Sequence, residues 1–203
     1  WMASGNEITK KIVEIYNING TILRANCSKI YKRSIINENQ LRYEESMSDG
    51  EDFLFTLNYL LHVNHIRAIS YAGYNYITYQ SSLTKTIYDI ESYVNWKKYI
   101  ITALINVDSK FGKNSSFLDP ILTTKLHSII NGCYLRNSLP KEIRLKTLST
   151  VISLLTPARQ KYIKKRYFIL KMYKILPVEV IDSVLSIYGF LFRAAYKKIK
   201  KLK

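Results

Sequence analysis

Two neighbouring carboxylates, Glu51 and Asp52, are the residues of this chain best placed to do chemistry. They follow Ser48-Asp49-Gly50, which supplies helix-capping groups, and they precede an apolar run with helical spacing. The pattern predicts a helix from Glu51 to His62, with both carboxylates in its first turn. There the helix dipole and the free N–H groups favour the ionised form. An oriented carboxylate can take the proton of a hydroxyl group as that group attacks an electrophile, so Asp52 is a candidate general base.

Short segments of characteristic composition accompany this pair in a definite order. A basic segment lies upstream, and a tyrosine-rich segment and a hydroxyl-bearing segment lie downstream. With the acidic segment itself, they are Ala25-Asn26-Cys27-Ser28-Lys29-Ile30-Tyr31-Lys32-Arg33-Ser34, Met47-Ser48-Asp49-Gly50-Glu51-Asp52-Phe53-Leu54-Phe55, Tyr74-Asn75-Tyr76 and Ser82-Leu83-Thr84. In this order and spacing, residues 5 to 90 resemble the second half of the catalytic domain of glycosyltransferase family 2. The resemblance is greatest to bacterial enzymes that build capsular polysaccharide, lipopolysaccharide or exopolysaccharide.

The resemblance implies a GT-A type enzyme that transfers a sugar, with inversion, from a nucleotide-sugar donor to a glycan or lipid-linked acceptor. Asp52 matches the family's general base, which takes the proton of the acceptor hydroxyl. Glu51, Lys29 and Tyr76 are then expected to bind or orient the acceptor. The alternative interpretation is that Gly50-Glu51-Asp52 is only an acidic helix N-terminus and that Lys29 belongs to a solvated basic helix face.

The sequence departs from the family pattern in two respects. Ile77-Thr78 stands where relatives often carry an arginine after the tyrosines. Family members also begin with a nucleotide-binding half whose Asp-x-Asp motif holds a divalent metal, and this sequence contains no such motif. The segment before Glu51 is too short for the several βα units of a nucleotide site. We therefore predict no cofactor or metal residues in this chain, expect a longer enzyme to use the nucleotide sugar with Mn²⁺ or Mg²⁺, and expect this chain alone to be inactive.

The elements that would position these residues predict an α+β fold that is mostly α. A partial GT-A acceptor-side region with a short β ribbon, residues 1–89, would precede a basic helical bundle, residues 90–203. In the first part, helices are predicted at Gly5–Asn17 and Lys29–Ile36, and two short strands between Ile66 and Tyr79. In the second part, the breaks at prolines and at Phe111-Gly112-Lys113-Asn114 divide the chain into helices. These are expected at residues 90–107, 117–137, 141–155, 159–173 and 178–202.

Positive charge is concentrated near the C-terminus of a chain with a formal net charge of +16. Residues 158–203 contain 13 Lys and Arg against only Glu179 and Asp182. The last predicted helix also carries an apolar stripe, a combination typical of helices that bind an anionic membrane surface. Alternatively, the stripe packs on the other helices and the lysines are solvated. A non-catalytic basic module that binds nucleic acid, membrane or a protein partner is the alternative function, although no nucleic-acid recognition signature accompanies the charge.

Several other classes of protein have little support in the sequence. No apolar run approaches the length of a membrane-spanning helix. Cys27 and Cys133 are too few and too far apart for a disulfide framework or a metal site, which favours reduced thiols in a cytoplasmic protein. With a basic tail, the protein is expected at the inner face of the cell membrane as a peripheral protein. His62, His65 and His127 lack partners at metal-ligand spacing and are interpreted as structural. The oligomeric state is left open.

Overall fold

The computed structural model describes residues 1–70, 74, 89–112, 118–136, 139–155, 159, 163 and 165–201. The chain forms two compact units, residues 1–121 and residues 122–203. Its described part is mostly helical, with one small antiparallel sheet of two strands. The coarse prediction of an α+β fold that is mostly α is therefore confirmed. No helix in the described ranges is both long enough and apolar enough to cross a membrane.

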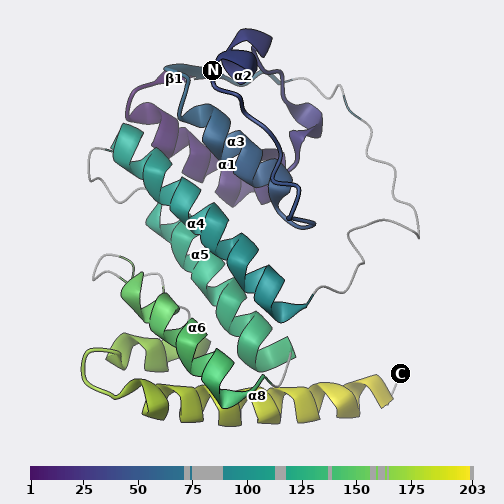
Figure 1. The fold of residues 1–203 in the computed structure, drawn as a ribbon, viewed down its shortest axis with the longest axis vertical. Helices are drawn as coiled ribbons and strands as arrows, with labels where there is room; N and C mark the ends of the chain where they lie inside the picture. The colour runs from purple at the N-terminus through teal and green to yellow at the C-terminus, as the bar shows by residue number, and fades with distance from the viewer. Residues whose placement is uncertain are drawn as a thin grey trace. The chain divides into compact units, whose positions relative to one another are not determined.

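Three helices form the body of the first unit (Figure 1). They are α1 (Glu7–Arg24), α3 (Glu51–Leu60) and α4 (Ile90–Gly112), and each packs against the other two. All three contribute apolar side chains to a common core because each has one buried face. Among the fully buried ones are Ile8, Ile12, Phe53, Leu57, Ile100 and Leu104. Helix α4 thus belongs to the first unit. The sequence predicted that an acceptor-side region ends at residue 89 and a helical extension begins at residue 90, and that division stays a prediction.

The small sheet joins the N-terminus to the segment after α3. Strand β1 (Met2–Ser4) pairs antiparallel with β2 (His65–Arg67), and Ala3 lies opposite Ile66. The sequence predicted two strands between Ile66 and Tyr79. Strand β2 overlaps the start of that range, but its partner is β1, and residues 71–73 and 75–80 lie outside the described part of the chain. A three-residue strand is too short for its alternation to identify its partner from the sequence.

Helix α1 is longer than predicted, and its predicted end at Asn17 is wrong. The helix continues through Gly20 to Arg24 because Leu23 is buried, and this packing stabilises the additional turns. The short helix predicted at Lys29–Ile36 is present but shifted, because α2 spans Arg33–Glu38. A 3₁₀ turn, η1 (Asn26–Ser28), precedes it. Helix α4 continues past its predicted end at residue 107, because Phe111 is buried, and it ends at Gly112, within the predicted break.

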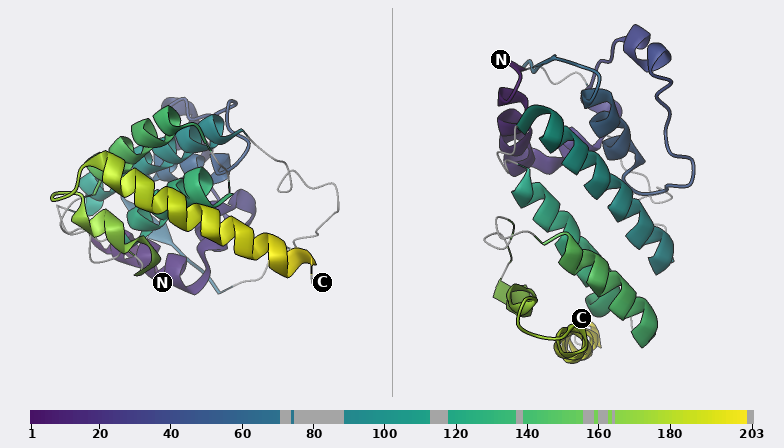
Figure 2. Two further views of the ribbon diagram at one scale, coloured as in Figure 1. Left: turned by 90° about the horizontal axis from the view of Figure 1, so that it is seen from below. Right: turned by 60° about the vertical axis from the view of Figure 1, so that its left-hand side comes forward.

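The second unit is built around the last helix, α8 (Val178–Lys201), which contacts three other elements (Figure 2). These are the π-helical segment η3 (Asn131–Arg136), helix α6 (Lys141–Ser153) and the 3₁₀ helix η4 (Lys165–Met172). Segment η3 continues directly from α5 (Asp119–Ile130), whose first residues belong to the other unit. Predicted helices at 117–137, 141–155 and 178–202 agree with these elements. Where the chain is described, the helix predicted at 159–173 is helical at residue 159 and takes the 3₁₀ form at residues 165–172.

An ion pair with a buried carboxylate and a partly exposed arginine ties α6 to α8 inside the second unit. Arg144 donates to both oxygens of Asp182, from Nε to Oδ1 at 2.9 Å and from Nη2 to Oδ2 at 2.9 Å. Tyr134 adds a third hydrogen bond, from its hydroxyl to Asp182 Oδ1 at 2.8 Å. Burial by itself raises the pKa of Asp182, but the hydrogen bonds from Arg144 and Tyr134 outweigh it and hold that pKa below its usual value. The carboxylate is therefore a satisfied structural charge.

Candidate functional site

Asp52 lies in the first turn of α3, as predicted. The helix begins after Gly50, which has a φ of +91°, and Leu54 N donates to the Gly50 carbonyl oxygen at 2.9 Å. Only glycine adopts this left-handed conformation without strain. A Cβ at this position would also stand 2.7 Å from Ile100 Cδ1 on α4. The backbone conformation at the start of α3 therefore requires a glycine at position 50. This glycine fixes the start of the helix and, with it, the positions of Glu51 and Asp52.

The Asp52 carboxylate is oriented by one residue of η1. Asn26 donates from its backbone nitrogen to Oδ2 at 3.3 Å and from its side-chain nitrogen to Oδ1 at 3.3 Å. Both bonds are long, and each carboxylate oxygen has two lone pairs. Asp52 is only half-buried. The carboxylate is thus held in place while it keeps the capacity to accept a further hydrogen bond from a bound hydroxyl group.

Asn26 is the centre of a polar network that joins three segments of the chain. Its Nδ2 also donates to the Tyr43 hydroxyl at 2.7 Å. Its Oδ1 accepts from the Tyr31 hydroxyl at 2.6 Å and from Thr56 Oγ1 at 2.9 Å. A carboxylate can only accept, so the amide nitrogen must be the atom that faces Asp52. The network therefore fixes the orientation of the Asn26 amide and, through it, that of the Asp52 carboxylate.

Aromatic rings surround this network. Tyr31 packs edge-on against Phe55, at 5.4 Å between ring centroids, and against Tyr59, at 4.7 Å. Tyr43 stacks on Phe55 with centroids 4.7 Å apart and remains half exposed, at 47%. Burial raises the pKa of Tyr31 to about 12, so its hydroxyl is protonated at neutral pH and donates to the network. An exposed tyrosine ring beside a carboxylate offers an apolar face together with a polar edge.

Lys29 lies close to Asp52, but its hydrogen bonds go elsewhere. Its ammonium donates to Ile22 O at 2.7 Å and to the carbonyl oxygen of Ala25, at the C-terminal end of α1. Carbonyl groups at a helix C-terminus have no partner within the helix, and the dipole there attracts a cation. Burial lowers the pKa of Lys29 to about 8, although the charge of Asp52 opposes this shift. Lys29 therefore closes α1, and its predicted contact with an acceptor stays a prediction.

The two other predicted residues have different outcomes. Glu51 lies beside Asp52 in the first turn of α3, half-buried, and its carboxylate has no hydrogen-bond or ion-pair partner in the described part of the chain. Tyr76 lies outside the described residues.

Sequence reasoning did not assign a role to Asn26, although it lies in one of the segments that carry the family resemblance. It missed Thr56, whose spacing of four residues from Asp52 on one helix was a usable signal, and Tyr43, for which no local signal exists.

Helix α4 holds the loop that leads into the site. Lys97 Nζ donates to Asp49 Oδ2 at 2.5 Å, and the lysine side chain is only 8% exposed. The same ammonium lies 4.6 Å from the centre of the Tyr93 ring. Together with Ile100 against Gly50, these contacts from α4 hold the residues just before α3. The position of Asp52 therefore depends on α4 as well as on η1.

A metal centre has no support among the residues described. No group of three or more His, Cys, Asp or Glu side chains that could hold a metal ion occurs there. The chain matches no protein-family model, and comparisons with curated proteins and with solved structures also found no match. The functional argument therefore depends on the residues around Asp52 alone.

Proposed function

We propose that the first unit forms the acceptor side of a GT-A type sugar-transfer site in which Asp52 is the general base. The observation that carries the proposal is the Asp52 carboxylate itself, half-exposed, oriented by two Asn26 N–H groups and able to accept another hydrogen bond. Support also comes from the sequence, because Asp52 belongs to the Gly-Glu-Asp segment, the most specific part of the resemblance, and Asn26 belongs to another of the segments on which the resemblance depends.

The proposed reaction is a direct displacement with inversion. The oxygen of an acceptor hydroxyl attacks the anomeric carbon of the donor sugar and passes its proton to an Asp52 oxygen. The new C–O bond forms as the bond between the anomeric carbon and the diphosphate oxygen breaks, and the nucleoside diphosphate leaves with the electron pair. Asn26 keeps the carboxylate in position, the exposed ring of Tyr43 provides a face for the acceptor sugar, and Glu51 orients the acceptor hydroxyls.

Donor binding is not assigned to residues of this chain. The nucleotide sugar and Mn²⁺ or Mg²⁺ are expected to bind a nucleotide-binding half, and the described residues do not fit a metal site. The acceptor would be a glycan or a lipid-linked sugar used for a bacterial surface polysaccharide. We place the reaction in the cytoplasm, at the inner face of the cell membrane.

The decisive experiment is a transfer assay with the complete product of the natural gene. It uses a panel of nucleotide sugars and glycan acceptors with Mn²⁺ or Mg²⁺, and compares wild type with Asp52→Asn and Glu45→Gln. The exposed Glu45 is a matched control because its substitution removes the same charge at a position close to Asp52 in the sequence. Loss of a general base lowers kcat by roughly 10²–10⁴-fold, so Asp52→Asn should be nearly inactive and Glu45→Gln should be normal.

A binding measurement on residues 1–203 gives an independent readout. The Asn26 amide N–H donates to the Asp52 carboxylate, so its NMR signal should shift when an acceptor hydroxyl binds there. A glycan that shifts this signal in wild type should bind more weakly to Asp52→Asn. Normal transfer by Asp52→Asn, or no perturbation of the Asn26 signal by any glycan that the enzyme uses, would contradict the proposed role.

A further inference from the structure

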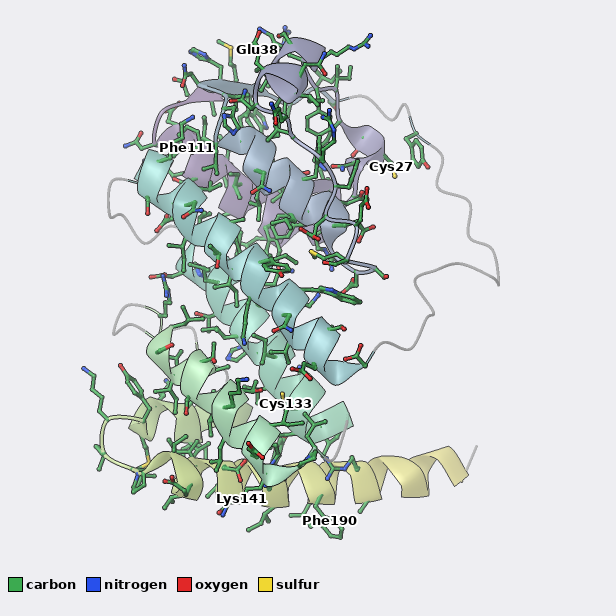
Figure 3. All side chains as sticks on the ribbon, viewed as in Figure 1. Cys27, Glu38, Phe111, Cys133, Lys141 and Phe190 are labelled. Carbon is green, nitrogen blue, oxygen red and sulfur yellow. The ribbon has the colours of Figure 1, made fainter. Side chains whose placement is uncertain are left out.

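Helix α8 exposes large apolar side chains on the face that it turns away from its own unit. Four of them recur at spacings of four, three and four residues and therefore lie in one line along the helix. They are Val180, Val184, Ile187 and Leu191, with exposed fractions of 42%, 37%, 63% and 59%. Phe190, labelled in Figure 3, projects from α8 on the side away from α6 and is 66% exposed. We call these five residues the outer face of α8.

The outer face is additional to the face with which α8 packs. Ile181 and Leu185 are fully buried on the opposite side of the helix, and Gly189 approaches the carbonyl oxygen of Tyr134 so closely that a Cβ would overlap it. The unit is therefore already satisfied by one side of α8. A continuous line of exposed apolar side chains on the other side marks a binding surface, whereas singly scattered ones need no explanation.

The charge next to the outer face identifies its partner. Helix α8 continues through Arg193 into four lysines, Lys197, Lys198, Lys200 and Lys201, and no acidic residue follows Asp182 in the sequence. An apolar helix face that leads into a basic segment matches the chemistry of an anionic bilayer, whose acyl chains lie beneath phosphate groups. Each basic residue close to such a surface strengthens binding by roughly fivefold.

The other occupants fit less well. A second copy of the chain could cover the outer face but would bring no acidic helix end to the basic turns, because both copies carry the same lysines. A nucleic acid would neutralise the lysines but would leave the outer face in water. We infer that α8 lies along the surface of an anionic lipid bilayer, with its outer face inserted between the lipids and its basic C-terminal turns beside the phosphate groups. This inference is independent of the proposed transfer reaction.

The test is vesicle sedimentation with the full chain. Vesicles of phosphatidylcholine alone are compared with vesicles that also contain phosphatidylglycerol. The variant Ile187→Ser/Leu191→Ser removes two members of the outer face. Its control is Ile18→Ser/Ile22→Ser, which makes the same type of change at exposed positions four residues apart on α1, where the exposed fractions are 83% and 44%. All four positions are exposed, so both variants should keep the wild-type circular dichroism spectrum.

Wild type and the α1 control should bind anionic vesicles and bind neutral vesicles far more weakly. The α8 variant should lose about a hundredfold in partition coefficient, close to tenfold for each side chain removed from the lipid. Binding should also weaken as salt rises from about 0.1 M to about 1 M, because the Debye length falls from about 10 Å to about 3 Å.

Three results would overturn the inference. The first is vesicle binding that the α8 variant retains. The second is absence of vesicle binding by a chain that light scattering shows to be a dimer in wild type and a monomer in the α8 variant, which would assign the outer face to a second copy. The third is salt-sensitive binding to DNA by a chain that does not bind vesicles.

Discussion

Three glycines of the first unit should respond differently to the same substitution with alanine. Gly50 combines a φ of +91° with an approach of 2.7 Å between an added Cβ and Ile100 Cδ1. The left-handed backbone costs a non-glycine residue about 1–3 kcal/mol, and displacement of a packed core side chain adds roughly 1 kcal/mol. Gly50→Ala should therefore lower the free energy of unfolding by about 2–4 kcal/mol.

The other two glycines separate the backbone contribution from the contact. Gly5 has a φ of +53°, but no atom lies within 4 Å of an added Cβ, so only the backbone opposes alanine. Gly5→Ala should cost about 1 kcal/mol. Gly20 lies inside α1, where the nearest atom to an added Cβ is Tyr16 Cε2 at an ordinary 3.5 Å. Gly20→Ala should raise the free energy of unfolding by roughly 0.5–1 kcal/mol, because alanine favours the helix and restricts the unfolded chain.

The assay is urea unfolding followed by tryptophan fluorescence. The chain has two tryptophans, Trp1 and Trp96, and both belong to the first unit, so the signal reports the unfolding of that unit. Trp96 is buried and should give most of the change. The expected order of stability is Gly20→Ala, wild type, Gly5→Ala and Gly50→Ala. A Gly50→Ala variant as stable as Gly5→Ala would refute the argument from the close approach of Ile100.

Three further predictions follow from the charged groups. Arg144→Met leaves the buried carboxylate of Asp182 without its bidentate partner and should cost about 3–5 kcal/mol, measured by urea unfolding with circular dichroism. The folded state holds the pKa of Asp182 below its ordinary value of about 3.9, so its contribution to stability is present above that pH and is lost as pH falls through the lower folded pKa. Thermal melts between neutral pH and pH of about 2 should therefore show a shallower acid slope for Asp182→Asn than for wild type. Burial lowers the pKa of Lys29 to about 8, and the charge of Asp52 opposes that shift, so NMR titrations of the Lys29 side chain should give a lower pKa in Asp52→Asn than in wild type. Equal pKa values in the two proteins would show that the two groups are not coupled.

The sequence predicted those parts of the structure whose determinants are local. The start of α3 was predicted correctly, although its N-cap residue is Gly50 and no side-chain capping hydrogen bond forms there. Helix α8 follows from a long apolar stripe bounded by Pro177. The length of α1 was missed because a segment rich in asparagine and glycine resembles a stop, while the burial of Leu23 that overrides it is a tertiary effect. The pairing of β1 with β2 was also missed. The two strands are far apart in the sequence, and strands this short carry no information about their partners.

In the candidate site, too, the local features were predicted from the sequence and the tertiary contacts were not. Asp52 was identified because its acidic pair lies at a helix start that the sequence shows. Its partner Asn26 could not be identified, because 26 residues separate the two in the chain and only the folded loop brings them together. Tyr43 comes from the irregular segment before α3, where no periodicity exists to place a side chain. Local chemistry therefore pointed to Asp52 as a candidate, and tertiary structure supplied the groups that orient its carboxylate.

The bond between Asn26 and Asp52 allows two roles for the carboxylate, and stability measurements can separate them. A side chain that only capped α3 would bond to N–H groups of its own helix, whereas Asp52 bonds to η1, outside the helix. It therefore ties η1 to α3 whether or not it is also a base. In Asp52→Asn, the side-chain oxygen can still accept one Asn26 bond, so stability should fall by only about 1 kcal/mol. If the Asp52 carboxylate only connects η1 to α3, the variant should lose transfer activity only in proportion to that small loss of stability. If Asp52 is also the general base, the variant should lose roughly 10²–10⁴-fold in kcat while its stability is nearly unchanged. The proposed mechanism requires this large loss of activity without a matching loss of stability.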